Sequence, residues 1–253
     1  MKIRVLGAFG GEGLGQRPSA FLLNDRVLMD GGSVTGALTV PEQLQIDHAL
    51  VSHSHLDHVA GVAFLAETIA CCGEGQNVTI ASLLPIVDAV KQSVFNNVLW
   101  PDFAVIPPGA PAVRYRALEE GAEHQLGDLR VTPVAVSHKV PTSGFIVHDG
   151  EAGLVYSGDT GPTEALWKAI QERHNVRAVL LECAFPNRLG DLATTSAHMT
   201  PELIARELPK LPAETPVWIY HVKPQFVEET SAELERIGAG RVSILEQDKV
   251  YQL

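Results

Sequence analysis

The sequence predicts an α/β fold in which two mixed sheets pack face to face and helices lie outside them. Each half of the chain reads as short strands followed by helices, and no linker, repeat or low-complexity segment divides the 253 residues. The run 178–181 is continuously apolar, which is typical of a strand buried on both faces. A chain of this length can bury one large core, so we expect a single domain over residues 1–253.

In the first half, a turn at Asn24-Asp25 folds a pair of strands, and Asp30 ends the second strand of that pair. An irregular segment at 97–111 closes this half and carries Trp100 and Phe103. The strands are expected at 2–7, 20–29, 49–51 and 78–80, and the helices at 59–70 and 83–94.

In the second half, the turns at 127–128 and 148–150 have hairpin composition. Thr200 followed by Pro201 is a typical helix start, because threonine caps the first turn and proline fits its first position. The strands are expected at 113–117, 129–136, 144–147, 153–156, 178–181, 217–220 and 242–245, and the helices at 163–173, from 200 and at 224–237.

Composition indicates an ordinary globular protein with an acidic surface. Hydrophobic residues make up 45%, charged residues 19%, and the formal net charge is -11. This charge disfavours a long nucleic acid as a partner, because phosphate-backbone affinity depends on clustered Lys and Arg. The three cysteines, Cys71, Cys72 and Cys183, imply no disulfide framework, and burial is the favoured role of Cys183. We find no signal core and no membrane span, so we expect a cytoplasmic protein without a membrane partner.

One stretch concentrates metal-ligand side chains. His53, His55, Asp57 and His58 occupy six positions directly after the apolar run 49–51. Imidazole nitrogen with carboxylate oxygen is the ligand set of zinc and similar cations. Two imidazoles one residue apart can share one ion, while Asp57 and His58 face a second. The alternative, in which Asp57 only caps a helix, does not explain four such residues at this spacing.

Three further polar residues each follow an apolar strand, where a sheet presents side chains to a cleft. They are His138, Asp159 and His221. Asp30 also ends a strand, and we expect its carboxylate to accept a hydrogen bond from a ring N–H of a metal-bound imidazole.

In this order, the segment 53–58 and then His138, Asp159 and His221 resemble the metallo-β-lactamase superfamily. The resemblance covers nearly the whole chain. It implies an αββα sandwich, the metallo-β-lactamase fold, with a dinuclear site at one edge of the sheets. By this resemblance, Asp159 bridges two divalent ions. The first ion is bound by His53, His55 and His138, and the second by Asp57, His58 and His221.

Among the branches of that superfamily, the chain looks most like the class II cyclic-nucleotide phosphodiesterases. Their His-x-His-Leu-Asp-His segment with a following glycine is completed here by Gly61, and the stretches 100–103, 181–187 and 197–201 are also similar. Where the family commonly has Gly-His-Leu-Thr-Pro, this chain has Ala197 and Met199. True β-lactamases usually carry cysteine in place of Asp159, and glyoxalase II-like enzymes add a helical domain that we do not find.

The resemblance implies hydrolysis of 3′,5′-cyclic nucleotides (cAMP or cGMP) to 5′-nucleotides by a hydroxide shared between the two metals. The ligands suit zinc best and also accept manganese or iron. We count Asp57, His198 and Glu182 as catalytic: His198 as a phosphate contact or general acid, and Glu182 as the residue that orients it. Lys223 is expected to add positive charge at the phosphate. Trp100 and Phe103 either stack on the base or fill the core.

Three other functions stay open. Ribonuclease Z shares a His-x-Thr segment, matched by His198 and Thr200, but usually adds a basic arm that this chain lacks. The others are a generic phosphodiesterase of the same fold and a sensor that binds metal or nucleotide without catalysis. A homodimer is an open option for the assembly.

Overall fold

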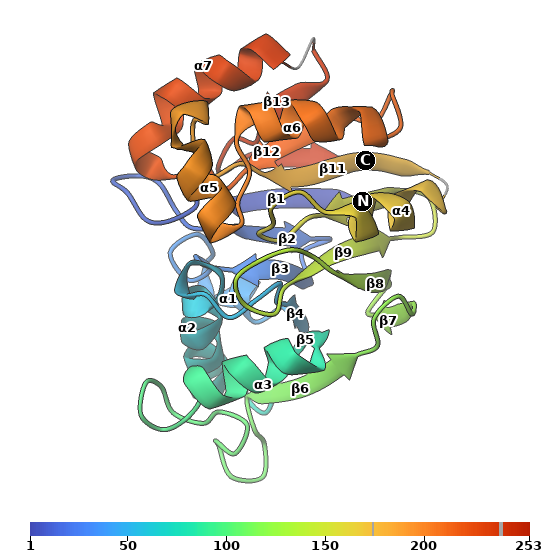
Figure 1. Ribbon diagram of the computed structural model, residues 1–253. Helices are drawn as coiled ribbons and strands as arrows, with labels where there is room; N and C mark the ends of the chain where they lie inside the picture. The colour runs from blue at the N-terminus through green and yellow to red at the C-terminus, as the bar shows by residue number, and fades with distance from the viewer. Residues whose placement is uncertain (174, 238–239) are drawn as a thin grey trace.

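The computed structural model describes residues 1–173, 175–237 and 240–253, and its two sheets lie face to face (Figure 1). In spatial order, the first sheet contains β14 (Val250–Gln252), β1 (Lys2–Gly7), β2 (Ala20–Leu23), β3 (Val27–Gly31), β4 (His48–Leu50), β5 (Val78–Leu83) and β6 (Val113–Leu118). The second contains β13 (Val242–Ile244), β12 (Val217–Tyr220), β11 (Val176–Glu182), β10 (Gly153–Tyr156), β9 (Ser143–His148), β8 (Leu129–Ala135) and β7 (His124–Leu126).

Both sheets are mixed in the same way. In the first sheet, the pairs from β14 to β3 are antiparallel and the pairs from β3 to β6 are parallel. In the second, the pairs from β7 to β10 are antiparallel and those from β10 to β13 are parallel. The predicted arrangement of two mixed sheets with helices outside is confirmed.

Alternating side chains bury both faces of each sheet. Phe21 and Leu23 of β2 point into the core between the sheets, whereas Leu22 points to the outer helices. Within the described ranges, no helix is both long and apolar enough to cross a membrane. The helices are α1 (Val40–Gln43), α2 (Leu56–Cys72), α3 (Leu84–Ser93), α4 (Glu164–Gln171), α5 (Gly190–Ser196), α6 (Pro201–Glu207) and α7 (Val227–Ile237).

A loop of the first sheet reaches the second. Residues 8–19 join β1 to β2, and there the His221 N–H donates to the Ala8 carbonyl (2.7 Å) while the Gly10 N–H donates to the Val222 carbonyl (3.1 Å). A Cβ on Gly10 would lie 2.4 Å from the His221 carbonyl oxygen, so only glycine permits this approach. The segment after β12 is therefore fixed by both sheets.

Candidate metal centre

The predicted ligand residues all come from the ends of strands or from the helix start that follows one. His53 and His55 follow β4. Helix α2 begins at Leu56, and Asp57 and His58 lie in its first turn. His138 follows β8, Asp159 follows β10 and His221 follows β12. The structure brings all of these side chains to one edge of the sandwich.

The first donor set contains three imidazoles and one carboxylate. His53 Nε2 lies 2.9 Å from His55 Nδ1, and His138 Nε2 lies 3.4 Å from the same His55 atom. Asp159 Oδ2 lies 3.6 Å from His53 Nε2. One donor atom from each of these four residues lies within 4.8 Å of the others, so the group could hold a metal ion.

The second donor set shares this carboxylate. Asp159 lies 3.3 Å from His58 Nε2 through Oδ1 and 3.1 Å from His221 Nε2 through Oδ2, while Asp57 Oδ2 lies 3.9 Å from His221 Nε2. Asp57, His58 and His221 form a second group with metal-ligand spacing. Asp159 therefore lies between the two donor sets.

Three buried donor atoms lack a partner. Within the described residues, His58 Nε2, Asp159 Oδ1 and His221 Nε2 make no hydrogen bond. Buried polar atoms normally have one, and a bound cation would supply it here. Imidazole nitrogens with carboxylate oxygens are the ligands of zinc, manganese and iron. The residues therefore fit divalent metal ions.

Burial and charge set the protonation of these ligands. Burial lowers the pKa of His53, His55 and His138, which favours the neutral imidazole that binds metal. Burial would raise the pKa of Asp159, but the imidazoles of His221, His58 and His53 hold it well below its usual range. Asp159 is therefore an ionised carboxylate.

Asp30 orients His58 from behind. Its Oδ2 accepts hydrogen bonds from His58 Nδ1 (2.6 Å), Ser52 Oγ (2.6 Å) and the Tyr156 hydroxyl (2.6 Å), and its Oδ1 accepts one from the Ser52 N–H (2.6 Å). Because a carboxylate only accepts, Nδ1 of His58 carries the proton and Nε2 faces Asp159. The expected outer carboxylate is therefore in hydrogen-bond contact with an imidazole of the cluster.

His198 and Glu182 form a buried pair beside the two donor sets. His198 Nδ1 lies 2.7 Å from Glu182 Oε1, and Glu182 also accepts the Thr160 N–H (3.0 Å) and the Met199 N–H (3.3 Å). The His198 ring stacks on His221, with centroids 5.4 Å apart. Burial would lower the pKa of His198, but the charge and hydrogen bond of Glu182 raise it above its ordinary value.

The other predicted site residues lie in different environments. Lys223 Nζ is 3.6 Å from Asp57 Oδ2, at the edge of the second donor set. Phe103 is buried in the core against Phe95, so the core-filling alternative describes it. Trp100 packs on Phe64 of α2, with ring centroids 5.3 Å apart, rather than on the donor sets. Cys183 is buried, as expected.

The comparisons agree with this geometry. Residues 31–221 match the family model described as a beta-lactamase superfamily domain. The chain belongs to the beta-lactamase superfamily. The crystal structure of unliganded yeast PDE1 has the same fold as this superfamily member, with a TM-score of 0.82 over 98% of each chain at 18% identity.

Relatives in sequence are hydrolytic enzymes. A probable 3′,5′-cyclic-nucleotide phosphodiesterase of Yersinia pestis is 27% identical over an alignment 277 positions long, gaps included, which covers 89% of this chain and 79% of the relative. A ribonuclease Z of Methanopyrus kandleri is 26% identical over 123 residues, or 47% of this chain and 39% of the relative. Family membership together with these relatives identifies the chain as a hydrolase.

Proposed function

We propose that the protein hydrolyses 3′,5′-cyclic nucleotides to 5′-nucleotides at two divalent metal ions. The observation that supports this most is the placement of Asp159 between two donor sets, with the His198–Glu182 pair beside them. In this proposal, His53, His55 and His138 hold one ion, Asp57, His58 and His221 hold the other, and Asp159 contacts both. The alignment with the Yersinia phosphodiesterase, which covers 89% of this chain, supports the choice of substrate.

Bound divalent ions supply a nucleophile at neutral pH, by lowering the pKa of water, and offset charge on phosphoryl oxygens. The chain itself supplies the proton for the leaving group. Glu182 accepts from Nδ1 of His198, so the other ring nitrogen, Nε2, is the one that can donate. The charge and hydrogen bond of Glu182 raise the pKa of His198, which favours the protonated imidazole that an acid needs. A proton delivered from Nε2 to the departing 3′ oxygen is general acid catalysis.

Lys223 is proposed to contact a phosphoryl oxygen. Its ammonium group lies 3.6 Å from Asp57 and is partly exposed, so it can reach a substrate at the edge of the second donor set. The net charge of -11 favours a small phosphodiester over a long nucleic acid. We therefore do not propose ribonuclease Z activity, and cleavage of precursor transfer RNA is measured as a competing result.

Point variants of the metal-reconstituted protein test the assignment. His55→Ala and Asp159→Ala should lose bound metal and activity together. His198→Ala should keep its metal and lose about 10²–10⁴-fold in kcat, the usual scale for an acid–base group. His124→Ala, in β7 outside both donor sets, is the matched histidine control and should behave as wild type. Metal content and turnover of cAMP and cGMP are the measurements.

Each alternative function gives a different result. Hydrolysis of bis(p-nitrophenyl) phosphate alone would indicate a generic phosphodiesterase, and cleavage of precursor transfer RNA would indicate a ribonuclease Z. Metal binding without hydrolysis of any substrate would indicate a sensor. Normal turnover by His198→Ala would exclude this residue from the mechanism.

A further inference from the structure

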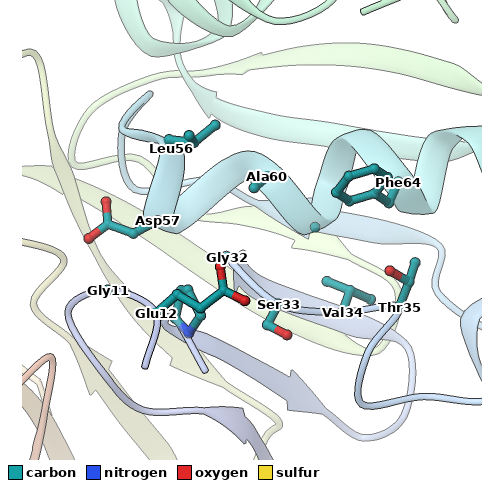
Figure 2. A pocket seen from close by; sticks show the side chains of 12 residues that line it. Gly11, Glu12, Gly32, Ser33, Val34, Thr35, Leu56, Asp57, Ala60 and Phe64 are labelled. Atoms are coloured by element: carbon teal, nitrogen blue, oxygen red, sulfur yellow. The ribbon is translucent and has the colours of Figure 1, made fainter. Parts of the chain in front are cut away.

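A cavity of about 500 Å³ opens beside the second donor set (Figure 2). Asp57 lies at its border, so a ligand there would adjoin the metal centre. The loop after β3, the first turns of α2 and the loop 8–19 form its walls. A second hollow, on the His138 side, is lined by aliphatic side chains, prolines and a few polar residues, and its lining includes no Phe, Tyr or Trp.

The aromatic side chain that lines the cavity comes from α2 and suits a flat ring. Phe64 leaves 47% of its surface exposed. Trp100 contacts the Phe64 ring edge to face, at an interplanar angle of 78°, and so holds it in place. Nucleobases stack well on an aromatic ring held in this way.

Polar side chains from two loops also line the cavity. They are the exposed Glu12 carboxylate and the half-buried hydroxyl groups of Ser33 and Thr35 (Figure 2), and within the described residues none of the three side chains has a hydrogen bond or ion pair. A carboxylate offers two acceptor oxygens and no donor. It therefore selects a ligand that presents two adjacent N–H groups.

We propose that this cavity binds the nucleobase of the substrate and that Glu12 makes guanine the preferred base. The inference rests on the proposed function, since it assumes a cyclic nucleotide at the metal centre. The Watson–Crick edge of guanine carries N1–H and N2–H, which match the two carboxylate oxygens of Glu12. Hypoxanthine keeps only N1–H, and adenine turns a lone pair at N1 toward the carboxylate.

The ratio of kcat/KM for cGMP to kcat/KM for cAMP tests this proposal. An effect on folding or on the metal centre changes both values alike and leaves their ratio unchanged. We expect wild-type kcat/KM to fall in the order cGMP, cyclic inosine monophosphate, cAMP. Glu12→Ala should lower the ratio of cGMP to cAMP by about 10–100-fold, the scale of one bidentate contact to a base.

Glu12→Gln gives a second result. A glutamine amide can accept from N6–H and donate to N1 of adenine, or accept from N1–H and donate to O6 of guanine, so this variant should bring the ratio of cGMP to cAMP close to one. Glu67→Ala removes another exposed carboxylate, from the α2 surface outside the cavity, and should leave the ratio unchanged. Equal kcat/KM values for cGMP and cAMP in the wild type, or a ratio that Glu12→Ala leaves intact, would overturn the assignment.

Failure of the proposed function has a separate signature. If wild-type protein hydrolyses bis(p-nitrophenyl) phosphate but no cyclic nucleotide, the proposed substrate class is wrong. The proposed base subsite is then also wrong, because it assumes a nucleotide substrate. If cyclic nucleotides are hydrolysed without the expected selectivity, the phosphodiesterase proposal stands and only the role of Glu12 is overturned.

Discussion

Three residues around the candidate metal centre have a positive φ angle although none is glycine. They are Asp30 (51°), Ala197 (57°) and His221 (69°). Such a backbone costs free energy and persists where the surroundings hold it. Here the surroundings are the hydrogen bonds that Asp30 accepts, the Ala197 carbonyl bonded by His138 Nδ1, and the contact of His221 with the loop 8–19.

Ala197→Gly should stabilise the protein by about 0.5–1 kcal/mol. Glycine relieves the left-handed strain of alanine, and the greater freedom of the unfolded glycine chain offsets part of the gain. Urea unfolding measures the change, and Ala197→Val, which adds a branched Cβ, should shift stability the opposite way. A lower unfolding midpoint for Ala197→Gly would contradict this account of the left-handed residue.

Asp30→Asn should weaken metal binding about 10–100-fold, the usual effect of losing an outer-shell partner. The amide has one acceptor oxygen in place of two, and its NH2 group would face donors that now bond the carboxylate. Competition with a chromophoric chelator measures the affinity without reference to catalysis. Tyr156→Phe, which removes one donor and leaves the carboxylate, should have a smaller effect. Unchanged affinity in Asp30→Asn would mean that Asp30 supports the fold only.

At the scale of elements, local sequence patterns predicted most of the strands and helices. The start of α6 is as predicted, because Thr200 Oγ1 accepts a hydrogen bond from the Leu203 N–H and Pro201 occupies the first helical position. Helix α5 was missed because its sequence, Gly-Asp-Leu-Ala-Thr-Thr-Ser, has no apolar period and few strong helix formers. Strand β14 was missed because three residues that pair with β1 across the chain leave no local signal.

The same limit applies to the site. Ligand types at strand ends are visible in a sequence, because apolar runs mark the strands that lead to them. The sequence did not single out Phe64 and Glu12, the residues of the proposed base subsite, since one lies within an apolar helical run and the other in a glycine-rich loop. Only tertiary packing decides that both border one cavity. Phe64 and Glu12 are 52 positions apart in the sequence, and nothing in the sequence between them indicates that they meet.

The first turn of α1 contains the Glu42 carboxylate, which should make the stability of the folded protein depend on pH. Glu42 accepts from the Thr39 N–H, the Thr39 hydroxyl and Arg4, and these bonds lower its pKa from 4.5 to about 2. Because the folded value is the lower one, the stabilisation by Glu42 is present above pH 4.5 and is lost as the pH falls toward 2. Carbon-13 NMR titration of the carboxyl measures the pKa; titration near 4.5 would contradict the capping box, and Glu42→Gln should remove this part of the pH dependence.

At the scale of the whole molecule, the donor sets join the two halves of the fold. The first sheet and α2 supply His53, His55, Asp57 and His58, and the second sheet supplies the other residues of the two donor sets. Any cation bound by both halves is bound only by the folded state, so it shifts the unfolding equilibrium.

Zinc at 100 times its Kd should stabilise the folded protein by about 2.7 kcal/mol. For a chain of this size, that corresponds to a rise in Tm of about 5–10 °C. Thermal unfolding with zinc and with a chelator measures the shift. Asp159→Ala should lose most of the response, while His124→Ala should keep it. An equal rise in Tm for Asp159→Ala would place the binding site elsewhere.

The bond between the Ser19 hydroxyl and His221 Nδ1, 3.2 Å across 202 positions of sequence, has a kinetic consequence. Loop closure over such a separation is slow relative to helix formation. After dilution from denaturant, backbone structure should thus recover first, and affinity for the cation should recover only when the sandwich has closed. The two donor sets are therefore complete only once the two sheets have come together.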